Sequence, residues 1–115
     1  DIYANPTYLP DDMQADYDRY WTDARVDRVL DVLERYGIAL EINARYRIPS
    51  FGIIRRAKQR GIKFTFGTNN VDADFGRLEY SLEAVEKCGL TADDIWFPAM
   101  SVRRGRPVVL YNKFE

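Results

Sequence analysis

Residues 64–72, FTFGTNNVD, combine a candidate buried strand with a loop that could bind a ligand. Phe64 and Phe66 alternate with Thr65, as expected for a strand with one apolar face, and Gly67 begins a turn. The turn then carries three neutral polar side chains, those of Thr68, Asn69 and Asn70. These groups can exchange hydrogen bonds with a ligand, but they supply none of the charged or imidazole groups that most enzyme sites use.

Glu41 is an acidic residue inside a second candidate strand, residues 38–43, IALEIN. It alternates with aliphatic residues and therefore lies on the face opposite to them, where an unpaired carboxylate would be costly to bury. A structural ion pair could satisfy it, with Arg45, Arg47 or Arg77 as the partner. Alternatively, Glu41 could act in acid/base chemistry or bind a cation, which makes it the candidate catalytic residue.

Polar side chains follow each candidate strand. A single Asn is usually a turn residue, because Asn tolerates left-handed backbone conformation, but amides that converge from several strands suit a polar ligand. The candidate ligand-binding residues are Asn5, Thr7, Asn43, Arg45, Arg47, Thr68, Asn69 and Asn70. The two arginines could bind a phosphate or carboxylate, or lie solvated in their loop. Asp72 and Asp74 could cap a helix or bind a divalent cation.

Composition excludes several classes of function. The chain has no His, which rules out Ser-His-Asp and Cys-His catalysis within it, and the lone Cys88 favours a reducing compartment, hence the cytoplasm. A net charge of −1 and one short basic cluster, residues 103–106, give no reason to expect nucleic-acid binding, and we interpret the cluster as a solvated turn. No apolar run is long enough to cross a membrane.

The periodicity of apolar residues predicts alternating strands and helices. The predicted strands are residues 1–5, 38–43 and 62–67, and the predicted helices are 22–36, 51–60 and 75–88. Thr22 and Ser50 are the expected N-caps of the first two helices. Shorter elements are expected as one or two helical turns within 11–20, a short helix near 91–94, and a strand or extended arm over 106–112.

This alternation predicts an α/β fold built from a parallel βαβαβα layer in one domain of 115 residues. Ligands in such folds gather beyond the carboxyl ends of the strands. We therefore expect Glu41, Asn43, Asn69 and Asn70 to point toward one shared polar mouth.

The order of these segments resembles the C-terminal half of a PHP (polymerase and histidinol phosphatase) domain, over roughly residues 1–95. The resemblance is carried by ALEIN at 39–43, a capped helix, a Gly, and the strand IKFTFG at 62–67 with its polar loop. It implies part of a distorted (βα)7 barrel, of which this chain would supply about three strands. It also implies a metal-dependent phosphoesterase with the metal cluster at the carboxyl ends of the strands.

The chain departs from the family at the positions that would bind metal. Asn5-Pro6 stands where the family has His-Pro, and Gly67 to Val71 stand where it has a Gly-Ser-Asp-Ala-His turn. Asn69 thereby replaces the Asp ligand and Val71 the His ligand. An amide oxygen is a weak ligand and valine is none. We therefore expect the isolated chain to hold no metal or other cofactor and to be inactive. A full-length protein could still bind a divalent metal.

Two functional expectations remain. One is a segment of a PHP-like phosphoesterase, and the other is a non-catalytic domain that binds a small phosphorylated or polar ligand. Because a layer cut from a barrel has open edges, residues 1–115 are expected to be a C-terminal fragment of a longer protein and to form a homodimer or larger assembly.

Overall fold

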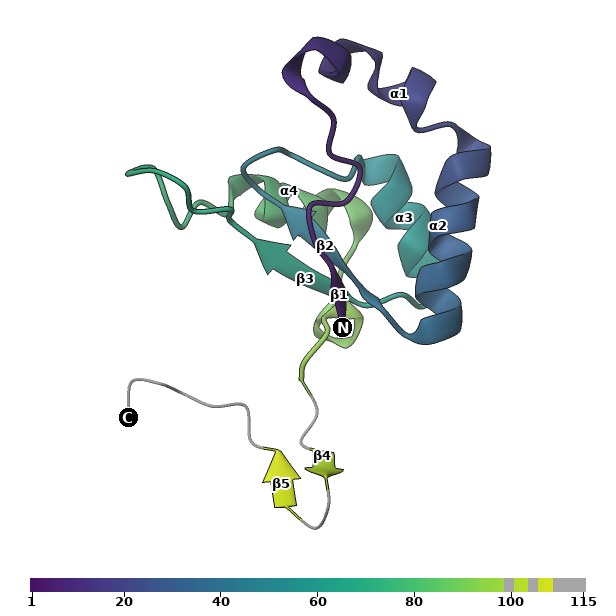
Figure 1. Ribbon diagram of the computed structural model, residues 1–115, viewed down its shortest axis with the longest axis vertical. Helices are drawn as coiled ribbons and strands as arrows, with labels where there is room; N and C mark the ends of the chain where they lie inside the picture. Colours follow the sequence, from purple (N-terminus) through teal and green to yellow (C-terminus); the bar gives the residue numbers. More distant parts are fainter. Residues whose placement is uncertain (99–100, 104–105, 109–115) are drawn as a thin grey trace.

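The computed structural model describes residues 1–98, 101–103 and 106–108 (Figure 1). Three strands, β1 (Ile2–Tyr3), β2 (Ala39–Asn43) and β3 (Phe64–Gly67), form a parallel sheet in the order β1-β2-β3. Tyr3 lies opposite Leu40, and Glu41 lies opposite Thr65. The predicted parallel arrangement is confirmed. The first strand is shorter than predicted, because Asn5 and Thr7 have positive φ angles of 49° and 63° and turn the chain away from the sheet.

Three helices connect or follow these strands: α2 (Asp23–Tyr36), α3 (Phe51–Gln59) and α4 (Glu79–Cys88). The Thr22 hydroxyl accepts a hydrogen bond from the N–H of Arg25, and Ser50 does the same for Ile53, so both predicted N-caps are confirmed. α2 ends at Gly37, whose φ of 62° closes the helix in the left-handed conformation that glycine adopts without strain.

The hydrophobic core lies between the helices and one face of the sheet. Leu40 and Ile42 of β2 and Phe64 of β3 point to this face and are at most 2% exposed. The helices add apolar side chains at helical spacing: Val26, Leu30, Leu33, Ile53, Ile54, Ala57, Tyr80, Ala84 and Cys88. Glu41 and Thr65 are out of phase with this set, so they lie on the opposite face of the sheet.

The third helix begins later than predicted. A helix over residues 75–88 was expected, but α4 starts at Glu79. Gly76 has a φ of 72° and Phe75 is 67% exposed, so the preceding residues neither adopt helical geometry nor bury an apolar face. Asp72 and Asp74 therefore lie well before the first turn of the helix and do not cap it.

The shorter elements agree in part with those expected from the sequence. They are η1 (Asp11–Asp16), α1 (Tyr17–Tyr20), η2 (Ala92–Asp94), and an antiparallel hairpin of β4 (Ser101–Arg103) and β5 (Arg106–Val108). After η2, Ile95 pairs in parallel with Phe64 beside β3. Residues 104–105 of the basic cluster and 109–112 of the expected arm lie outside the described residues. Within the described part of the chain, every helix is too short or too polar to cross a bilayer.

Candidate functional site

The carboxyl ends of β1 and β2 bring together three of the predicted site residues, which we name the carboxylate cluster: Asn5, Glu41 and Asn43. Oε1 of Glu41 accepts hydrogen bonds from the backbone N–H of Asn5 (3.1 Å) and from Nδ2 of Asn43 (2.9 Å). The same Nδ2 lies 3.0 Å from Oδ1 of Asn5. Asn43 is only 1% exposed, so its amide is a buried polar group with its donors satisfied.

Asn43 also connects this cluster to the loop that follows β2. Its Oδ1 accepts a hydrogen bond from the N–H of Tyr46 at 3.0 Å. Its backbone N–H and C=O both pair with Ile48, at 2.8 and 3.2 Å. The loop of residues 44–47 is therefore held at both ends, which fixes the position of the two predicted arginines within it.

Glu41 keeps one carboxylate oxygen available. Among the described residues no hydrogen bond reaches Oε2, and no arginine pairs with Glu41. Gly67 on β3 makes room for this oxygen, because a Cβ built there would lie 2.4 Å from it. The structural ion pair that the sequence allowed is thus not formed within the described chain. An ionised carboxylate in this position can accept a hydrogen bond from a ligand hydroxyl or amine.

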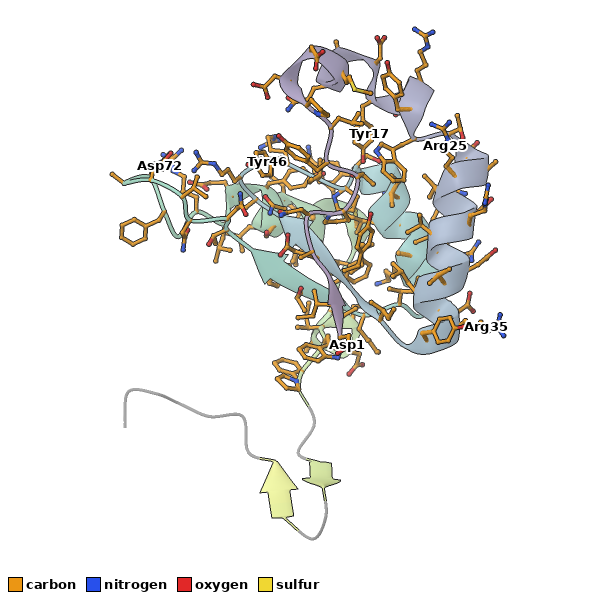
Figure 2. The ribbon with its side chains drawn as sticks, in the orientation of Figure 1. Asp1, Tyr17, Arg25, Arg35, Tyr46 and Asp72 are labelled. Atoms are coloured by element: carbon orange, nitrogen blue, oxygen red, sulfur yellow. The ribbon has the colours of Figure 1, made fainter. Side chains whose placement is uncertain are left out.

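A cavity of about 520 Å³, the arginine cavity, lies beyond the carboxyl ends of β2 and β3. It is lined by residues 44–47 and by Asp74, Arg77, Glu79 and Tyr80. Figure 2 shows Tyr46 and Asp72 on this side of the molecule, beyond the arrowheads of the two strands. The lining carries three arginines and two carboxylates, and Asp72 and Glu83 pair with two of these arginines, so an anion would be bound by individual guanidinium donors and not by a net positive charge.

Each arginine of the cavity has an acidic partner and unused donors. Arg45 binds Asp72 through both terminal nitrogens, at 2.6 and 3.3 Å, and Nε of Arg77 lies 2.9 Å from Asp74. The hydrogen bond from Arg45, with a second one from the backbone N–H of Asp74, lowers the pKa of the Asp72 carboxyl. Because a guanidinium has five N–H donors, each pair leaves donors available for a ligand.

Arg47 lies over the ring of Tyr80, with 4.8 Å between its guanidinium carbon and the ring centre, and pairs with Glu83 at 3.3 Å. The Tyr80 hydroxyl donates to the carbonyl of Pro49 at 2.5 Å. Burial raises the pKa of Tyr80 well above its usual range, so this phenol stays protonated and remains a donor. Stacking therefore orients Arg47 toward the cavity independently of the ion pair.

Thr7 does not contribute to this mouth. It is 4% exposed, and its hydroxyl accepts a hydrogen bond from the Tyr17 hydroxyl at 2.6 Å. Tyr17 in turn accepts one from the N–H of Ser50 at 3.1 Å. The Thr7 hydroxyl is therefore used to tie the first loop to the start of α3, which is a structural role.

Of the polar residues after β3, Thr68 and Asn69 are half-buried, and Asn70 begins an exposed loop. Oδ1 of Asn70 accepts the N–H of Gly76 at 2.9 Å, and Asn69 has a φ of 50°. Both therefore act as turn residues. No hydrogen bond among the described residues joins Thr68, Asn69 or Asn70 to Glu41 or Asn43, and none of these five residues lines the arginine cavity.

The described residues do not fit the metal cluster that the PHP resemblance implies. They contain no group of three or more His, Cys, Asp or Glu side chains placed to hold a metal ion. Glu41 has amide neighbours, and Asp72 and Asp74 pair with arginines. Cys88 is buried, and this burial raises the pKa of its thiol, which agrees with a structural cysteine.

Sequence reasoning missed Tyr80 and Gly67 as site residues. Tyr80 belongs to the buried stripe of α4, and its spacing shows only that it is part of the core. Gly67 is interpreted from the sequence as a turn residue. Its close approach to Glu41 is a contact between two neighbouring strands, which the local sequence does not show. No protein-family model, curated protein or solved structure matches this chain.

Proposed function

We propose that this chain binds a small polar ligand with one anionic group, at the carboxyl ends of its parallel strands, without hydrolysing it. The supporting observation is the arginine cavity, in which Arg45, Arg47 and Arg77 converge from two loops. A phosphate or carboxylate matches the planar donors of a guanidinium. The order of segments in the sequence resembles that of a PHP domain, a family whose ligand site lies at the carboxyl ends of the strands.

The carboxylate cluster adds a second requirement for the ligand. Oε2 of Glu41 is an acceptor, so it favours a ligand that carries a hydroxyl or amine donor. Asn43 hydrogen-bonds both to Glu41 and to Tyr46 of the loop that carries Arg45 and Arg47. A hydroxylated phosphate ester or carboxylate offers an anion for the arginines and a hydroxyl for Glu41.

The second candidate is a segment of a PHP-like phosphoesterase, which is favoured by the position of Glu41. Its carboxylate lies on the sheet face opposite the helices, at the strand ends where that family carries out hydrolysis. The described residues lack a metal cluster, so this function requires metal-binding groups from outside them. Under this alternative the isolated chain is inactive.

Calorimetry with glycerol 3-phosphate, glycerol and inorganic phosphate tests the first proposal. We expect saturable binding of glycerol 3-phosphate, weaker binding of phosphate and none of glycerol. Arg77→Ala should weaken binding by about tenfold or more, the effect expected from removing a charge-assisted contact. Arg35→Ala is the matched control, because Arg35 lies at the end of α2, far from the cavity (Figure 2).

A phosphate-release assay tests whether the chain itself hydrolyses the ester. The chain is dialysed and then incubated with glycerol 3-phosphate and Mg²⁺, Mn²⁺ or Zn²⁺. Both candidates predict release at the buffer rate from the isolated chain, so in that case the calorimetric binding is what supports the binding function. Metal-dependent release that is lost in Glu41→Gln would instead support the phosphoesterase and overturn the first proposal.

A further inference from the structure

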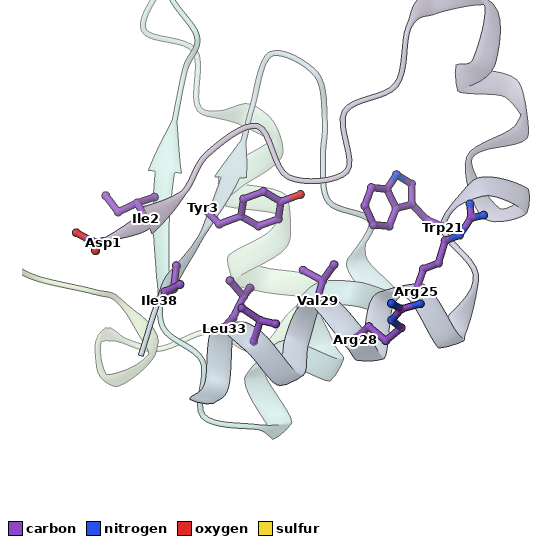
Figure 3. A pocket seen from close by; sticks show the side chains of 10 residues that line it. Asp1, Ile2, Tyr3, Trp21, Arg25, Arg28, Val29, Leu33 and Ile38 are labelled. Carbon is purple, nitrogen blue, oxygen red and sulfur yellow. The ribbon is translucent and has the colours of Figure 1, made fainter. Parts of the chain in front are cut away.

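An apolar groove of about 670 Å³ lies between the open edge of β1 and the outer flank of α2 (Figure 3). Its apolar lining is formed chiefly by Ile2, Tyr3, Trp21, Val29, Leu33 and Ile38. Ile2 is 44% exposed and Val32, also in the groove, is 49% exposed. Arg25 and Arg28 lie at one end of the groove, and Asp1 lies at the other (Figure 3). Apolar surface gathered in one concave place is typical of an interaction site.

The opposite flank of α2 shows how a neighbouring helix is held in this fold. There α2 and α3 lie side by side, joined by ion pairs of 2.5–3.5 Å. Arg56 of α3 and Arg60, the residue that follows α3, pair with an acidic stripe on α2, formed by Asp23, Asp27, Asp31 and Glu34. A basic flank on one helix thus meets an acidic stripe on the next.

The side of α2 that faces the groove also carries basic residues, but among the described residues no acidic stripe lies against them. Arg25 and Val32 are separated by two helical turns and lie opposite the acidic stripe of α2. Within the described residues, no carboxylate lies within ion-pair distance of Arg25 or Arg28. Arg25 instead donates to the carbonyl of Tyr20 at 2.7 Å. Both guanidinium groups are therefore available to acidic side chains from outside.

We infer that this groove docks an amphipathic α-helix of a partner protein, with its apolar face on the groove and acidic residues at i, i+4 spacing beside Arg25 and Arg28. A second copy is a less suitable occupant than a separate acidic helix. Its acidic stripe is already paired with its own α3. This inference is independent of the ligand site.

A helical peptide provides the probe. The peptide has the sequence of residues 22–37 with the substitutions A24E and R28K, and it contains the acidic stripe and the apolar face of α2. A lactam bridge that joins the two substituted side chains holds it helical. Binding to the full chain is followed by the indole N–H resonance of Trp21, assigned with Trp96→Phe. The control peptide carries D27N, D31N and E34Q. Circular dichroism verifies that both peptides are helical.

We expect saturable binding that shifts the Trp21 resonance and weakens about tenfold with the control peptide. Arg25→Glu with Arg28→Glu in the chain should weaken it equally, and a peptide with D27K and D31K should restore binding to this variant. Arg19→Glu is the charge-matched control and should have no effect. Absence of binding, or an affinity that does not change when these charges are changed, would overturn the inference. So would a dimer in sedimentation that Arg25→Glu abolishes, because the occupant would then be a second copy.

Discussion

The carboxylate of Glu41 lies over Gly67, so that a Cβ at Gly67 would come within 2.4 Å of Oε2. The φ of Gly67 is not positive, so the backbone does not require glycine at this position. The missing side chain therefore makes space for the carboxylate rather than for a turn. Glu41 and Gly67 belong to neighbouring strands and form one side of the proposed mouth.

Gly67→Ala should displace Glu41 and break its hydrogen bonds to Asn5 and Asn43. We expect a loss of about 1–2 kcal/mol in the free energy of unfolding, as for overpacking elsewhere. Urea denaturation of Gly67→Ala, Glu41→Ala and the double variant measures the coupling. Because Glu41→Ala removes the clash, the alanine at 67 should cost much less in that background. Equal costs in both backgrounds would show that the contact does not exist.

Asn43→Ala should destabilise the chain by about 2–3 kcal/mol, because it leaves the N–H of Tyr46 without its acceptor and removes one of the two hydrogen bonds to Oε1 of Glu41. Asn69→Gly is the control, since this residue has a φ of 50° and no side-chain hydrogen bond within the described residues. Its effect should stay below about 0.5 kcal/mol. Thermal and urea denaturation give both values. Similar losses for the two variants would contradict the buried network.

Tyr17→Phe tests the link between the first loop and α3. The substitution removes the donor to Thr7 and the acceptor for the N–H of Ser50, and we expect a cost of about 1–2 kcal/mol in unfolding free energy. Tyr20→Phe is the matched control, and we expect it to be neutral. Amide exchange at Ser50 should accelerate in Tyr17→Phe alone. Unchanged exchange there would rule out the contact.

Asp94 should contribute to acid sensitivity. The backbone N–H of Thr91 first, and Lys58 second, lower the pKa of its carboxyl in the folded state. A carboxyl with a lowered pKa stabilises the fold above its unfolded pKa of about 4, and this contribution is lost as the pH falls through the folded pKa. Asp94→Asn should therefore be less stable than the natural chain at pH 7 and differ less from it at pH 2. A constant difference over this range, measured by urea denaturation, would exclude the linkage.

Much of the fold could be predicted from local patterns. The helical spacing of Val26, Leu30 and Leu33, and the caps at Thr22 and Ser50, were sufficient to place α2 and α3. Alternation of strands and helices was sufficient to predict a parallel sheet. The start of α4 was missed because it depends on the left-handed conformation of Gly76, which a glycine permits but does not require.

Only those residues of the candidate site that directly follow a strand could be predicted. Convergence of Glu41 and Asn43 with Asn5 follows from parallel strands that end at one edge. The partners of Arg45 and Arg47 could not be predicted, because Asp72 and Glu83 are 27 and 36 residues away in the sequence. The hydrogen bond of Thr7 could not be predicted for a similar reason, since nothing in the local sequence shows that the Tyr17 hydroxyl donates to it.

The most direct test of the proposed function is a ¹⁵N–¹H correlation titration of the chain with glycerol 3-phosphate, using glycerol as the control. We predict saturable shifts for the side-chain amides of Asn5 and Asn43, the backbone amide of Tyr46 and the guanidinium of Arg77. The resonances of the Trp21 groove should stay unchanged, and glycerol should shift none of these signals. If the mouth resonances do not move, or if the same shifts appear with glycerol, the strand ends do not form a binding site for an anionic polar ligand.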